Sequence, residues 1–103
     1  MALPSGTPWS DGALRGTLYV FASAGDTLPM HAHDAATAHI SIITRGAFRV
    51  HGPGWSQINV PGPVLSFAPG QAHEFVAIEA NSVVLQIVKG EVPPSAVSLA
   101  VAA

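Results

Sequence analysis

Short apolar runs alternate along the chain with clusters of Gly and Pro, and no stretch keeps a helical period. Within several runs apolar and polar residues alternate, which is the period of a half-buried β-strand. Short strands separated by turn signals are typical of an all-β sandwich or barrel. The predicted strands are Thr17–Ala22, Thr27–His33, His39–Arg45, Ala47–His51, Ser56–Val60, Val64–Ala68, His73–Glu79 and Ser82–Val88.

The length of 103 residues predicts a single domain, 1–103, with one modest core. The strands place this core at about 17–90. Residues 1–12 and 91–103 lie outside it, and we expect them to be peripheral arms that dock on other apolar surface.

Alternation also assigns faces to the run His39–Arg45. His39, Ser41 and Ile43 share one side, and the isoleucines 40 and 42 share the other. If His39 points inward, these two isoleucines point outward. Only 10% of the residues are charged, where about a quarter is typical, and 49% are apolar. We therefore expect a homodimer that buries apolar surface.

Charge and composition exclude several classes of function. The chain has four Arg or Lys residues against six Asp or Glu, so no basic patch for nucleic acid can form. No apolar run approaches the ~20 residues that span a membrane. Cysteine is absent, which excludes disulfides and thiolate metal sites. The N-terminus has no basic leader with an apolar core, so we expect a cytoplasmic protein.

Four of the five histidines occupy organised positions: His31, His33, His39 and His73. Residues two apart in a strand share a face, so His31 and His33 can direct both imidazoles at one point. Neutral imidazole is a common ligand of divalent transition metals. This pattern favours a metal site inside a β-barrel.

The spacing of these histidines resembles the two motifs of the cupin family. The first motif, G-x5-H-x-H-x3–4-E-x6-G, is similar to the segment from Gly25 to Gly46, with His39 in place of glutamate and one residue late. The second, G-x5-P-x-G-x2-H, is similar to the segment from Gly62 to His73, with Ala68 in place of the proline. The resemblance covers roughly residues 17–90.

The resemblance implies an all-β cupin-like double-stranded β-helix, or jelly-roll barrel. It also implies one divalent transition metal ion (Fe, Mn, Ni, Cu or Zn), held by His31, His33, His39 and His73. Four neutral imidazoles leave the charge of the cation uncompensated, so the site should attract an anionic oxygen ligand. The implied function is a non-haem, dioxygenase-type enzyme acting on a small anionic oxygen-bearing substrate. A non-catalytic binding or regulatory domain and a metal-assisted isomerase or lyase are the alternatives.

Other side chains are weaker candidates, and no catalytic residue beyond the metal ligands is identified. Asp34 and Glu74 flank predicted ligands and could accept a histidine N–H, although solvated charges are the simpler interpretation. Arg45 is in phase with His39 near the rim. The sequence predicts that His51 is a surface residue. Apolar side chains are expected to line the mouth of the barrel, among them Ile43, Phe67 and Phe75.

Overall fold

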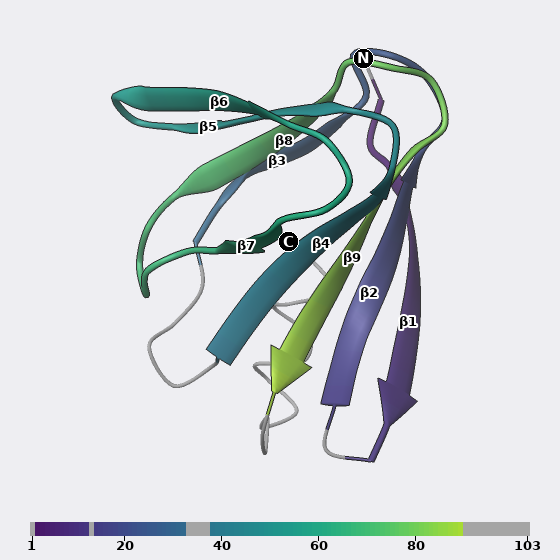
Figure 1. The fold of residues 1–103 in the computed structure, drawn as a ribbon, viewed down its shortest axis with the longest axis vertical. Helices are drawn as coiled ribbons and strands as arrows, with labels where there is room; N and C mark the ends of the chain where they lie inside the picture. Colours follow the sequence, from purple (N-terminus) through teal and green to yellow (C-terminus); the bar gives the residue numbers. More distant parts are fainter. Residues whose placement is uncertain (1, 13, 33–37, 90–103) are drawn as a thin grey trace.

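A computed structural model describes residues 2–12, 14–32 and 38–89, with the backbone alone at 38–39 and 88–89. Nine strands in this part of the chain form two antiparallel sheets, which lie as two layers in Figure 1. The sheets have the orders β1-β2-β9-β4-β7 and β3-β8-β5-β6. The strands are β1 (Ser5–Asp11), β2 (Leu14–Phe21), β3 (Thr27–His31), β4 (Ala38–Arg45), β5 (Phe48–Gly52), β6 (Trp55–Asn59), β7 (Val64–Ser66), β8 (His73–Ala77) and β9 (Ser82–Lys89).

Most of residues 1–12, expected to be a peripheral arm, lie at the edge of the five-stranded sheet. Ser5–Asp11 is the edge strand β1, and it pairs with β2 along its whole length, from Ser5 opposite Val20 to Asp11 opposite Leu14. Its Gly, Pro and Ser residues hide the strand period. An edge strand tolerates Pro8, because the missing N–H costs no bond where no further strand pairs.

The core lies between the two sheets and is dominated by aromatic side chains. Phe21, Phe48 and Phe75 are almost completely buried, and Phe48 meets the other two rings edge to face at centroid distances of 4.7 and 5.8 Å. Ile43 is buried with them at 2% exposure. Ile43 and Phe75 therefore pack in the centre of the core. The expectation that these two side chains line the mouth of the barrel is wrong.

The chain passes from one sheet to the other at Gly46, between β4 and β5. Gly46 has φ of 81°, and a Cβ at this position would lie 2.1 Å from Ser82 Oγ. The Ser82 hydroxyl accepts a hydrogen bond from Ala47 N (3.2 Å) and donates to Glu79 O (2.8 Å). Glycine at position 46 lets β4 and β5 approach the start of β9 closely.

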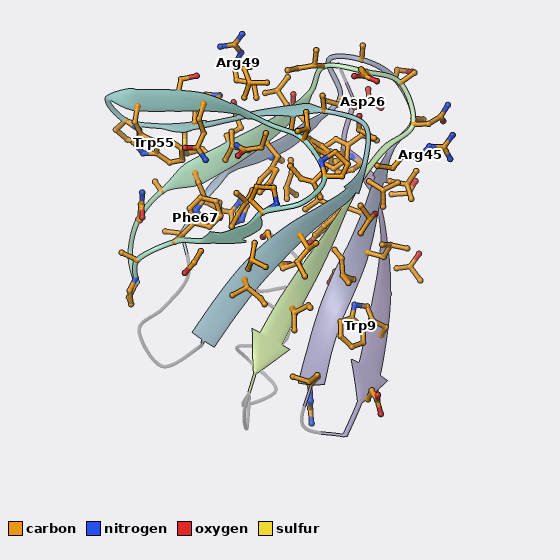
Figure 2. The ribbon with its side chains drawn as sticks, in the orientation of Figure 1. Trp9, Asp26, Arg45, Arg49, Trp55 and Phe67 are labelled. Carbon is orange, nitrogen blue, oxygen red and sulfur yellow. The ribbon has the colours of Figure 1, made fainter. Side chains whose placement is uncertain are left out.

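The register of β4 confirms part of the predicted face assignment and corrects the rest. Ser41 and Ile43 are buried on the inner face, while Ile40 and Ile42 are half-buried on the outer one. The expected phase of Arg45 is wrong, because an irregularity after Ile43 places Arg45 opposite Val83, on the outward side. Figure 2 shows the Arg45 side chain directed away from the molecule.

Among the described residues no helix is long and apolar enough to cross a membrane.

Candidate functional site

Two of the four predicted ligands, His31 and His73, meet between the sheets. His31 ends β3, His73 begins β8, and the two residues are direct Cα partners in the ladder. Their ring centroids lie 4.4 Å apart at an interplanar angle of 62°. His73 is fully buried and His31 is half-buried. The sequence places these residues 42 positions apart, and strand pairing makes them neighbours.

Backbone hydrogen bonds fix the tautomer of both imidazoles. His31 Nδ1 lies 2.7 Å from Pro29 O, and His73 Nδ1 lies 2.9 Å from Gln71 O. A carbonyl oxygen can only accept, so each Nδ1 carries the proton and donates. In each neutral ring the lone pair is then on Nε2, and both Nε2 atoms are buried. This arrangement is typical of metal-binding histidines, so the pair fits a divalent transition metal ion.

Burial keeps both imidazoles neutral. Desolvation lowers the pKa of His73 to about 4, against the opposing hydrogen bond to Gln71 O, and the proximity of His31 lowers it further. Desolvation also lowers the pKa of His31, and its hydrogen bond to Pro29 O opposes this. Neutral imidazole is the form that ligates a metal, so the pair is ready to bind at neutral pH.

An aromatic side chain that the motifs do not include holds the His73 ring in place. Phe67 stacks on this imidazole with a centroid distance of 3.8 Å and an interplanar angle of 4°. The Trp55 ring lies near Phe67, with the two centroids 6.3 Å apart, and Figure 2 shows both rings beside the four-stranded sheet. Gln71 closes the loop that connects Phe67 to His73. Its Oε1 accepts from Ala68 N and its N–H donates to Ala68 O, both at 2.9 Å.

The other two predicted ligands cannot be placed as fully. His33 lies outside the described residues. His39 is a backbone position in β4, where its Cα is opposite that of Val88. The next residue, Ile40, pairs with Ser66, which directly precedes Phe67, so the backbone of position 39 runs close to the His73 side of the barrel. Among the side chains that are described, no group of three or more His, Asp or Glu residues could hold a metal.

A row of buried polar side chains lies next to position 39 and was missed by the sequence reasoning. Thr17, Gln86 and Ser41 are Cα neighbours across β2, β9 and β4, and they are only 1–3% exposed. Ser41 is two residues from His39 and opposite Leu65, itself two residues before Phe67. The signal was available, because each polar residue occupies an inward phase of its strand where an apolar one is usual.

The idea that Glu74 accepts from a ligand histidine is wrong. Its Oε1 lies 2.7 Å from His51 Nε2, across the β5–β8 ladder on the outer face of the sheet. His51 is therefore half-buried in a side-chain pair and is not an isolated surface residue. Alternation explains the error, since Glu74 follows the inward His73 and must point the other way. Asp34 lies outside the described residues.

The low pKa of His73 predicts that the metal-free protein becomes less stable in mild acid. Unfolded histidine titrates near 6.5 and His73 in the fold near 4, so between these values the unfolded state binds more protons. The free energy of unfolding should fall by about 3 kcal/mol as pH drops from above 6.5 to about 4. Urea unfolding with a chelator present, at pH values across this window, measures the loss. The matched His73→Phe variant should lack this component, and an identical slope in both proteins would contradict the assignment.

Comparison with known proteins identifies the fold of this chain and does not identify its function. No protein-family model matches the sequence, and no curated protein matches it. Solved structures do. The chain is similar to KdgF from Halomonas sp., with 21% identity, a TM-score of 0.72, and coverage of 87% of this chain and 81% of that one. It is also similar to an RmlC-like cupin from Desulfovibrio desulfuricans, with 19% identity, a TM-score of 0.72, and coverage of 84% of this chain and 82% of that one. A third similar structure is a cupin 2 conserved barrel domain protein from Salinispora arenicola, with 17% identity and a TM-score of 0.69. The match covers 93% of this chain and 81% of that one.

These similarities and the two antiparallel sheets define an all-β domain of the double-stranded β-helix class. The chain is a small protein with the cupin fold, as the motif resemblance predicted. At these identities the likeness concerns the fold alone, because one fold hosts many functions.

Proposed function

We propose that this protein is a metal-dependent enzyme of the non-haem, dioxygenase type, acting on a small anionic substrate that offers an oxygen ligand. The observation that carries the proposal is the His31–His73 pair. It presents two neutral imidazoles from paired strands, each with its Nδ1 proton bound to a backbone carbonyl. Metal-ligating histidines usually donate their other ring N–H to a backbone carbonyl or a carboxylate, and both histidines do so here.

The histidines would hold the metal ion, and the residues around His73 would orient its ring. His31 and His73 hold one divalent transition metal ion through Nε2, and His33 and His39 complete the proposed set. When bound, Fe, Mn, Ni or Cu would supply redox chemistry with oxygen, and any of these ions or Zn would supply Lewis acidity. Phe67 and the Gln71 carbonyl keep the His73 ring in one orientation. That fixed orientation reduces the reorganisation needed on binding.

Charge balance at the metal and the buried polar residues beside position 39 favour a small polar substrate. Four neutral histidines carry no charge to balance a divalent cation, which favours an enolate, phenolate or carboxylate as the incoming ligand. Thr17, Ser41 and Gln86 offer hydroxyl and amide groups on the inner face, next to position 39. A substrate with a second polar group could bond to them.

The test combines metal analysis with oxygen uptake. Protein purified without a histidine tag or added metal should contain close to one redox-active metal per chain. It should also consume oxygen with some member of a panel of enolic and phenolic acids. Bound metal without uptake would contradict the oxygenase and favour the isomerase, lyase or binding alternatives. Absence of any metal, even after incubation with Fe²⁺, Ni²⁺ or Zn²⁺, would overturn the metal site itself.

A further inference from the structure

Arg15 occupies an inward position at one end of the five-stranded sheet. In the same strand Thr17, Tyr19 and Phe21 are buried on the inner side, while the residues between them are half-buried or exposed. The strand pairs in continuous register with both β1 and β9, so the alternation extends to Arg15 and places it on the inner side as well. Because Arg15 lies near the end of the strand, its side chain is exposed.

The register also puts Arg15 in line with position 39. Its Cα is opposite that of Val88 in β9, and Val88 is in turn opposite His39 in β4. Two strand spacings amount to about 10 Å, which is close enough for one small molecule to contact both positions. Figure 1 shows the start of β2, the end of β9 and the start of β4 at the same end of the sheet.

The neighbouring row on the inner side is polar. It consists of Thr17, Gln86 and Ser41, which are Cα partners across the same three strands. The side chain of Thr17 also forms a hydrogen bond with Tyr19. A guanidinium group, two hydroxyl groups and an amide therefore occupy adjacent rows at the end of the sheet that contains position 39. A few polar groups that converge in this way are what orients a small ligand in a binding site.

The charge of Arg15 is available to a ligand. Among the described side chains the one ion pair joins His51 to Glu74, so Arg15 has no carboxylate partner there. The other two arginines face elsewhere, because Arg45 lies on the outward side of β4 and Arg49 is exposed on the outer face of the four-stranded sheet. Arg15 is thus the one arginine on the inner side of the fold.

We propose that Arg15 determines specificity by binding a carboxylate of the substrate while another oxygen of the same substrate binds the metal. This inference rests on the proposed function and narrows its substrate class to small acids that carry a carboxylate in addition to the metal-binding oxygen. A guanidinium group binds a carboxylate through two parallel N–H···O bonds, which fix orientation as well as position. Those bonds hold one end of the substrate in line with position 39, over the polar row.

The experiment measures binding by titration calorimetry on the Zn²⁺-loaded protein, because Zn²⁺ is redox-inactive and leaves both probes intact. The probes are malate and 2-hydroxybutyrate. They share a four-carbon chain with a hydroxy-acid end, and they differ only in a terminal carboxylate against a methyl group. Wild type should bind malate about 10- to 100-fold more tightly, the range expected for hydrogen bonds to a charged group. Arg15→Gln should remove this preference and leave the affinities for 2-hydroxybutyrate and Zn²⁺ unchanged.

Two further variants separate a specific contact from a general effect of charge. Arg45→Gln removes the same charge from the outward side of β4 and should keep the full preference for malate. Arg15→Lys keeps the charge without the planar fork and should retain a reduced preference.

Three results would overturn the assignment of Arg15. They are a Zn²⁺-loaded wild type that binds both acids equally, an Arg15→Gln variant that prefers malate as wild type does, and an Arg45→Gln variant that loses the preference to the same extent as Arg15→Gln. A wild type that binds no Zn²⁺ would be a different result, because it would overturn the proposed metal site and this inference with it.

Discussion

His73→Ala should lose bound metal, with an affinity at least ~100-fold below that of wild type, since even residues that only orient a ligand are worth 10–100-fold. His73 is fully buried, and its pKa is lowered to about 4 by desolvation, so it supplies a neutral donor that solvent cannot replace. His31→Ala should behave in the same way, because the centroids of the two imidazole rings lie only 4.4 Å apart. Metal titration followed by equilibrium dialysis measures both affinities.

The matched control for this prediction is His51→Ala. It removes a histidine that is paired with Glu74 on the outer face of the same sheet, and it should leave metal affinity unchanged. His39→Ala, read by the same titration, reports whether position 39 contributes a ligand. His73→Phe preserves aromatic volume and separates loss of ligation from loss of packing. Full metal stoichiometry in His73→Phe and His31→Ala, with the circular dichroism of wild type, would show that the pair is not a metal site.

Gly46→Ala should lower the free energy of unfolding by about 2–5 kcal/mol. Two costs combine here. A φ of 81° costs a non-glycine residue about 1–2 kcal/mol, and overpacking a closed site costs about 1–3 kcal/mol more. The new Cβ would lie 2.1 Å from Ser82 Oγ and 2.8 Å from Ser82 Cα, and the backbone atom cannot move aside cheaply. Urea unfolding of the two proteins gives the difference.

Gly54→Ala separates these two costs. Gly54, in the turn between β5 and β6, has nearly the same φ of 80°, but nothing lies within 4 Å of an added Cβ. This variant should lose only the backbone component, about 1–2 kcal/mol. Equal losses in the two variants would show that the contact with Ser82 is not limiting, and the close approach of β4 and β9 would need another explanation.

Much of the fold could be predicted from the sequence because its signals are local. Turn residues such as Gly46 and Gly70 occupy positive φ, where L side chains are strained, so their spacing marks where the chain turns. Alternation within His39–Arg45 correctly placed Ile43 inside and Ile42 outside. The N-terminal strand β1 escaped prediction because an edge strand accepts Pro, Gly and Ser, and its pairing with β2 is the only thing that defines it.

In the candidate site, too, the sequence revealed residue types and the structure revealed contacts. Histidine spacing and the motif resemblance pointed to His31 and His73, and the local period could not show that Phe67 stacks on one of them or that Glu74 points away. The sequence by itself determined an all-β domain, its turns and the residues able to ligate a metal, since these depend on residue type and strand period. Only the tertiary structure decided that His31 and His73 meet, that an irregularity after Ile43 turns Arg45 outward, and that the buried polar side chains of β2, β9 and β4 lie side by side on the inner face. Such facts depend on which strands pair and in which register, and pairing between distant strands is settled by packing of the whole chain.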